Sequence, residues 1–500
     1  MTGQLVARLR DMVFASRFYD VALGNGVPTA VSTIPFSPAR SAAACDLADG
    51  RFPATLPPKS EVKGNFRWLA AHVPDQQAAT VVADWLNWNR RWSTDGWRID
   101  ILAERLSHWL NCDTAMLSLF DGETSEAWRR AIARGAKHLT RAHPLPADDW
   151  RRLLVRRGQL AASLALDAPT AKLGELLRLL GEDVDTQILA DGGHRSRRPS
   201  VALAALSLLI DMRDMLSAGS IEPPVGLVSA IDRMVPFIKG LCHGDGSFAL
   251  LQGTTSEPSV LIEEIIAASG CKGRAMSSAP HTGFHRLRAA QTALIVDSGA
   301  TPGRAAGLPS AASFELSTGR TRLIGGCGMR LTDTGSGDAW RDALSRTAAQ
   351  STLVIDDRDG SPAAEAHVER RDQDGARLIE ISHDAYRLSI GIHHRRLIYL
   401  SADGTDIRGE DVLSGGGSRP FSVRFHLHPE VRASMVAGGG EVILKPPKGR
   451  GWRFHCRYPV MLEDSVNFFD GRQHRAQQIV ILGNHEPSET TVKWRLAMEK

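Results

Sequence analysis

The sequence has few tyrosines, little excess charge of one sign and no long apolar run. Only 4 of its 500 residues are tyrosine, and none lies between residues 20 and 385. Most of the chain therefore lacks a phenol that could transfer a proton. The formal net charge is +4, which excludes a strong overall field that would attract nucleic acid, and we expect no nucleic-acid partner.

Disulfide frameworks, cysteine-based metal sites and membrane spans are also absent from the sequence pattern. The 6 cysteines are widely spaced and include no Cys-x-x-Cys pair, so we expect them to be reduced and mostly buried. The longest apolar stretch, residues 201–210, is too short to cross a bilayer. Charged residues interrupt residues 1–20, and no export signal is visible there. We expect a soluble protein without membrane insertion.

The first half of the chain has the pattern of helices. Apolar residues recur at helical spacing from about residue 70 to 265, as in the stripe formed by Leu102, Leu106 and Trp109. Connectors that contain Pro or Gly separate these segments, and short connectors favour antiparallel helix pairs. Further helices are expected over residues 124–142, 171–190, 201–217 and 225–240.

The second half has the pattern of strands. From Phe421 to His428, apolar residues alternate with Ser, Arg and His, which predicts a strand with one apolar face. Many short strands with Gly-containing turns are typical of an antiparallel β-sandwich. We place the boundary between a helical domain, residues 1–275, and a sandwich domain, residues 276–500. This order predicts an α+β multidomain fold, with a ligand cleft expected between the domains.

Several short motifs occur in a fixed order along both halves. They are Gln187–Pro199 (QILADGGHRSRRP), the HGDG turn that begins at His243, Phe314-Glu315-Leu316 followed by Gly319-Arg320, Gly409-Glu410-Asp411, and the RFHLHP string from Arg424 to Pro429. This ordered series resembles the heparinase II/III-like family. The resemblance implies an (α/α) toroid followed by an antiparallel β-sandwich. It also implies polysaccharide lyase chemistry on acidic polysaccharides that contain uronate.

Such a lyase removes the proton next to the uronate carboxylate and expels the leaving oxygen by β-elimination. A cationic or hydrogen-bonding group must neutralise the carboxylate, and a Tyr or His base must take the proton. Phe284 stands where relatives have tyrosine, so His194, His243, His281 or His285 would have to supply the base.

The resemblance implies catalytic roles for three histidines, His194, His243 and His285. We expect substrate-binding roles for Arg195, Arg197, Arg198 and Asp245. Arginine's planar fork suits carboxylates and sulfates. The alternatives are that His194 only bonds its own loop, that the arginines form a solvated loop face, and that Asp245 stabilises a structural turn.

Zinc sites known in some relatives have no suitable ligands here. The matching positions are Leu308, Gly326 and Gln350, which offer no imidazole, thiolate or carboxylate. We therefore expect no metal and no other cofactor. A replacement site that uses His426, His428 or the histidines at 383, 393 and 394 is an alternative to ordinary polar contacts of the sandwich.

The sequence thus predicts a lyase-like protein that acts on an acidic polysaccharide. The first alternative is a glycan-binding protein of the same fold with impaired catalysis, and the second is a structural or regulatory partner in polysaccharide handling. By the resemblance, the location would be the cell envelope or periplasm. A cytoplasmic location is the alternative, because no signal peptide is visible.

Overall fold

The computed structural model describes residues 10–28, 31–32, 38–49, 51, 64–71, 73–91, 93, 96–141, 150–254, 258–299, 307–331, 339–362 and 364–499. They form two compact units. The helical unit draws on residues 1–46, 53–187 and 204–231, and the sandwich unit on residues 47–52, 188–203 and 232–500. The boundary expected between residues 275 and 276 stays a prediction about the domains. The sandwich unit includes three segments from before this boundary, residues 47–52, 188–203 and 232–275, whereas the helical unit includes none from after it.

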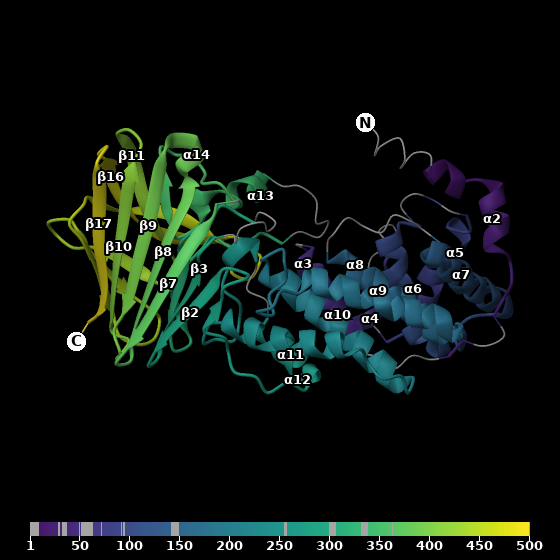
Figure 1. Ribbon diagram of the computed structural model, residues 1–500. Coiled ribbons are helices and arrows are strands. Elements are labelled where there is room, and N and C mark those ends of the chain that lie inside the picture. Colours follow the sequence, from purple (N-terminus) through teal and green to yellow (C-terminus); the bar gives the residue numbers. More distant parts are fainter. Residues whose placement is uncertain are drawn as a thin grey trace. The chain divides into compact units, whose positions relative to one another are not determined.

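Helices fill the first half of the chain, as the sequence predicts (Figure 1). They are α2 (Arg17–Leu23), α3 (Pro38–Ala48), α4 (Arg67–Ala71), α5 (Gln76–Trp88), α6 (Ile99–Leu117), α7 (Gly122–Arg141), α8 (Arg151–Ala165), α9 (Thr170–Gln187), α10 (Pro199–Ala218), α11 (Val225–Gly240) and α12 (Ser259–Ser269). Expected and observed helices agree to within about three residues, apart from residue 142, which lies outside the described part of the chain.

Close helix packing in the helical unit depends on glycine. α6 and α8 make extensive contact, and a β-carbon at Gly158 of α8 would lie 2.6 Å from the Ala103 carbonyl oxygen of α6. The apolar stripe Leu102, Leu106 and Trp109 is buried, as its spacing predicts.

Two antiparallel sheets make up most of the sandwich unit. One has the order β1-β2-β3-β4-β5-β11-β16-β15, with β6 paired to β11, and the other has the order β12-β13-β14-β17-β10-β9-β8-β7 (Figure 1). The strands are β1 (Ser278–Ala279), β2 (Phe284–Ala289), β3 (Thr292–Asp297), β4 (Ser313–Thr318), β5 (Thr321–Gly325), β6 (Leu353–Ile355), β7 (Ala366–Gln373), β8 (Ala376–Tyr386), β9 (Ile392–Leu400), β10 (Asp406–Gly415), β11 (Arg419–Leu427), β12 (Arg432–Met435), β13 (Glu441–Lys445), β14 (Trp452–Cys456), β15 (Val460–Asn467), β16 (His474–His485) and β17 (Glu489–Met498). Short helices α13 (Ala339–Leu344) and α14 (Arg387–Ile390) lie between strands.

The alternation seen in the sequence explains the sandwich core. Phe425 of β11 is fully buried in the apolar cluster between the sheets, and it packs against Trp494 of β17 with ring centroids 5.0 Å apart. Phe314 of β4 stacks on the same indole, with centroids 5.7 Å apart. Gly409 of β10 makes room for this indole, because a β-carbon there would lie 2.0 Å from Trp494 Cε2. The glycine of the Gly-Glu-Asp motif is therefore a packing requirement.

Candidate functional site

The DGGH motif forms the tight loop between α9 and α10, within the sandwich unit. A β-carbon at Gly192, which has φ +83°, would lie 2.0 Å from the Arg233 carbonyl oxygen. One at Gly193 would lie 2.2 Å from Thr282 Oγ1. Asp191 accepts hydrogen bonds from Thr282 N and from Thr282 Oγ1, each at 2.7 Å. The first three residues of the motif therefore have structural roles: the aspartate anchors the loop by hydrogen bonds, and the two glycines allow close backbone contact.

His194 lies inside this loop, with only 1% of its surface exposed. Its Nδ1 accepts from Ser196 N at 3.1 Å and contacts Ser196 Oγ at 2.9 Å. The proton of the neutral ring therefore sits on Nε2. Burial and the nearby charge of Arg198 lower the pKa of His194 to about 3. A ring of such low basicity is a poor proton acceptor near neutral pH.

The arginines of the same loop differ in their surroundings. Arg197 is buried, with its guanidinium 5.3 Å from the centre of the Phe284 ring. It has a left-handed backbone, with φ 61°. It donates to the Thr282 carbonyl oxygen at 2.8 Å and forms an ion pair with Asp297. Arg197 thus holds the loop to β2 and β3. Arg195 and Arg198 are half-buried.

The HGDG motif forms a second turn, which packs on the β4–β5 hairpin. A β-carbon at Gly244 would lie 1.8 Å from the Gly319 carbonyl oxygen. Asp245 accepts from Ser247 N at 2.9 Å and from Arg322 Nε at 2.8 Å. Burial raises the pKa of Asp245, but the charge and hydrogen bonds of Arg322 outweigh it and hold the pKa at about 2. Asp245 is therefore an ionised partner of Arg322.

His243 is buried between two residues of β4. Its Nδ1 lies 2.9 Å from Ser317 Oγ, and its Nε2 lies 3.0 Å from Glu315 Oε2. Glu315 also accepts from the backbone N–H groups of Leu250, at 2.7 Å, and Gly326, at 3.2 Å. Burial and the charge of Arg322 lower the pKa of His243, although Glu315 opposes this shift. The neutral ring therefore donates to Glu315 and accepts from Ser317.

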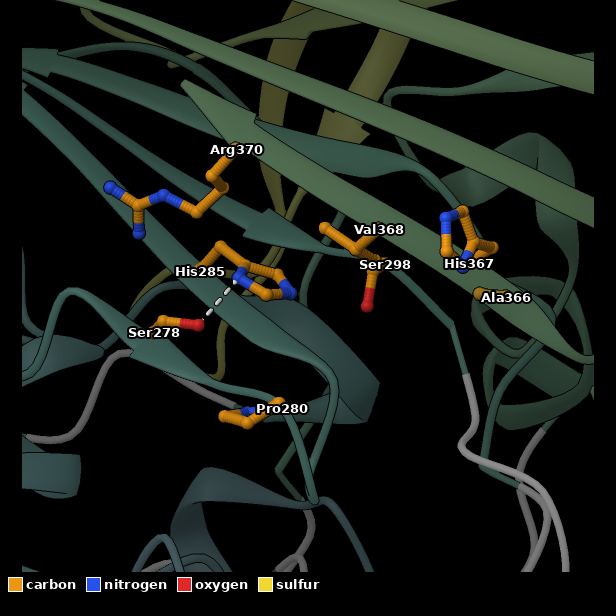
Figure 2. A pocket seen from close by; sticks show the side chains of 8 residues that line it. All are labelled: Ser278, Pro280, His285, Ser298, Ala366, His367, Val368 and Arg370. Atoms are coloured by element: carbon orange, nitrogen blue, oxygen red, sulfur yellow. Dashed lines mark hydrogen bonds between the residues drawn. The ribbon is translucent and has the colours of Figure 1, made fainter. Parts of the chain in front are cut away.

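His285 is the exception among the three histidines. It lies on β2 with 3% of its surface exposed, and its Nδ1 lies 3.1 Å from Ser278 Oγ. Within the described part of the chain its Nε2 has no hydrogen-bond partner. Figure 2 shows the ring in a cavity together with Arg370 of β7 and Ser298. Burial and the charge of Arg370 lower the pKa of His285 to about 4.

The seven expected site residues lie on three different segments of the chain. The DGGH loop contains His194 and the three arginines, the HGDG turn contains His243 and Asp245, and the cavity contains only His285. Sequence reasoning missed Arg370, since an arginine on a polar strand has no distinguishing pattern. It also missed Glu315 as the partner of His243, although the Phe-Glu-Leu motif contains it.

Of the three positions at which relatives have zinc ligands, two lie next to each other in the structure. A β-carbon at Gly326 would lie 3.2 Å from Gln350 Oε1, whereas the Leu308 backbone N–H donates to Gln252 Oε1 at 2.7 Å. His426 bonds the Ala348 carbonyl oxygen and Ser465 Oγ, each at 2.9 Å. Among the residues that the structure describes, no three His, Cys, Asp or Glu side chains are grouped so as to hold a metal ion.

Residues 272–495 match the family described as heparinase II/III-like, C-terminal. A relative from Caulobacter vibrioides (strain NA1000 / CB15N), FtsZ-localized protein C, is 29% identical over 478 residues, which are 86% of this chain and 80% of the relative. The crystal structure of heparinase III has a TM-score of 0.70 at 14% identity and covers 98% of this chain and 91% of its own. Heparan sulfate lyase HepC from Pedobacter heparinus has a TM-score of 0.67 at 15% identity, with 94% and 84% covered. These structures confirm the expected (α/α) toroid and β-sandwich.

The expected location in the cell envelope or periplasm is wrong. The relative that covers 86% of this chain is named for localisation with FtsZ, which points to the cytoplasm rather than the periplasm. In the described residues, no helix combines the length and apolar character needed to cross a membrane.

Proposed function

We propose that this chain is a non-catalytic binding protein on a lyase scaffold, because residues 272–495 match the heparinase II/III-like, C-terminal family and the chain is similar to a protein named for FtsZ. In this proposal it works in the cytoplasm, in association with FtsZ. It corresponds to the alternative of impaired catalysis, with a protein partner in place of an acidic polysaccharide.

The observation that carries this proposal is the internal use of the motif histidines. His194 bonds Ser196 within its own loop, and His243 bridges Ser317 and Glu315. Burial lowers the pKa of both rings. A general base needs a ring nitrogen within hydrogen-bond reach of the substrate proton. Neither ring offers one in this arrangement.

Phe284 supports the same proposal. Its ring is fully buried and lies beneath the Arg197 guanidinium. By the resemblance, a relative that cleaves polysaccharide has a tyrosine hydroxyl at this position. Phenylalanine has no proton to exchange there, so the chemistry would need a different acid and base.

Two assays on the full chain test the proposal together. Purified chain is sedimented with FtsZ polymers assembled in GTP, and with FtsZ in GDP as the matched control. The same preparation is incubated with heparan sulfate and chondroitin sulfate, and ultraviolet absorbance follows the conjugated product of elimination, with a heparan sulfate lyase as the positive control. We expect co-sedimentation with the polymers and no absorbance change. Absence of FtsZ binding would contradict the proposal.

The second candidate is β-elimination on an acidic polysaccharide that contains uronate. The ordered motifs favour it, and so does His285, whose Nε2 has no hydrogen-bond partner among the residues that the structure describes. A Phe284→Tyr variant separates the two functions, because it returns the missing hydroxyl. We expect this variant to remain inactive, since His194 and His243 stay in their internal contacts. Turnover of either glycan by the wild-type chain would instead establish the lyase.

A further inference from the structure

A cavity of about 290 Å³ lies in the sandwich unit, at the edges of the two sheets. β1 ends the order of one sheet, and β7 ends the order of the other. The lining residues are Ser278, Pro280, His285, Ser298, Ala366, His367, Val368 and Arg370 (Figure 2). Its volume is at the lower end of the range of ligand pockets, which suits a small molecule rather than a polymer.

Among the described residues, the lining contains cationic and hydroxyl groups but no carboxylate. Arg370 of β7 lines the cavity, with 17% of its side chain exposed, and Figure 2 shows its guanidinium on the side of the His285 ring that faces Ser278. It donates to the Ser277 carbonyl oxygen and lies 3.5 Å from Asp372 Oδ2. A guanidinium has five N–H donors. These two contacts leave donors for a further acceptor.

His285 has a buried ring nitrogen, Nε2, that meets no hydrogen-bond partner among the described residues. Nδ1 lies 3.1 Å from Ser278 Oγ, and when this hydroxyl donates to Nδ1 the proton of the neutral ring lies on Nε2. Within the described residues this N–H meets no acceptor, and it is shielded from bulk water. A buried donor without a partner is unfavourable, and an oxygen placed in the cavity would relieve that cost.

We propose that this cavity binds a small molecule that carries an oxyanion, a phosphate, sulfate or carboxylate group, with the oxyanion at Arg370 and a further oxygen of the same molecule at His285 Nε2. The guanidinium supplies charge and N–H donors, and the imidazole supplies a directional donor. Ser298 Oγ, which donates to the Gly283 carbonyl oxygen at 2.9 Å, retains lone pairs for a hydroxyl of the same molecule. This inference does not depend on FtsZ association.

The test is calorimetric titration of the full chain with inorganic phosphate, sulfate, glucose 6-phosphate and glucuronate, with glucose as the neutral control. The variants are Arg370→Gln and His285→Asn. Arg371→Gln is the matched control, because Arg371 has the same charge on the same strand. Its side chain is 69% exposed and pairs with Glu369 instead of lining the cavity.

We expect saturable binding of at least one anion and none of glucose. Arg370→Gln should weaken it about tenfold or more, as expected for the loss of a charge-assisted hydrogen bond, while Arg371→Gln leaves it unchanged. Tighter binding of glucose 6-phosphate than of inorganic phosphate would identify a phosphorylated metabolite as the ligand. If His285→Asn does not fold, Arg370→Gln alone decides. Equal affinity in Arg370→Gln and wild type, or no saturable anion binding at millimolar concentrations, would overturn the proposal.

Discussion

Asp411 of β10 is the acceptor for three buried donors in the sandwich core, and replacing it with asparagine tests the role of this network. Its Oδ1 accepts from His394 Nε2 at 2.8 Å and from Arg396 Nε at 2.6 Å. Its Oδ2 accepts from Trp494 Nε1 at 3.0 Å. His394 Nδ1 in turn lies 2.8 Å from His383 Nε2. The carboxylate therefore fixes the positions of four side chains.

The Asp411→Asn substitution removes both the charge and one acceptor. Arg396 is fully buried, and its other bonds are to the carbonyl oxygens of Ala312 and Ser351. Its charge would then lack a counter-ion. An asparagine at this position would also place its amide N–H groups against one of the N–H donors from which Asp411 accepts a hydrogen bond. Breaking one side of a buried ion pair costs about 3–5 kcal/mol, and we expect a loss of this size for Asp411→Asn.

Glu410→Gln is the matched control on the same strand. Glu410 pairs with Lys493 at 3.2 Å, with side-chain exposures of 31% and 73%. Such exposed pairs contribute about 0–1 kcal/mol. Denaturant unfolding, followed by tryptophan fluorescence, measures the free energy of unfolding of the wild type and of both variants. If Asp411→Asn is no less stable than Glu410→Gln, the inference that the network stabilises the sandwich is refuted.

Two further predictions concern packing and pH. Gly158→Ala should destabilise the helical unit by about 1–3 kcal/mol, because its new methyl meets the Ala103 carbonyl oxygen. Gly174 lies at an exposed position of α9 with open space around it, and Gly174→Ala should stabilise this unit by about 0.5–1 kcal/mol; thermal unfolding checks both variants, and equal shifts would contradict the packing argument. The thermal unfolding midpoint should fall as the pH is lowered below 6.5. In the unfolded chain, imidazoles bind protons in this range, whereas the buried rings of His194 and His426 stay neutral because their pKa values are about 3 and 4. A stability that is constant between about pH 7 and pH 5 would contradict this expectation.

The sequence predicts the fold well because the fold depends on local periodicity. Helical spacing locates α11 at its observed bounds, and strict alternation locates β11. The order of strands in the two sheets could not be predicted, because it depends on pairing between distant segments. For example, β10 lies between β9 and β17, and Asp406 pairs with Ala497.

The candidate site was less predictable, because residue type does not reveal which atoms are already bonded. The sequence identifies His243 and Glu315 in two separate motifs, but only the fold brings them within 3.0 Å. It identifies His285 through its neighbour Phe284, whereas Arg370 comes from a strand on the other sheet. Contacts between distant segments thus decide that His285 has a ring nitrogen without a hydrogen-bond partner among the described residues.

The ordered motifs say more about the fold than about catalysis. Gly193 permits close approach to Thr282, Arg197 joins the DGGH loop to β3, and Gly409 makes room for Trp494. Each contact holds a loop or strand in place whether or not the chain cleaves a glycan. Catalysis additionally requires a reactive atom that can reach the substrate, and a phenylalanine cannot supply the hydroxyl of a tyrosine. A lyase-like scaffold can therefore keep its motifs for structural reasons while its function changes.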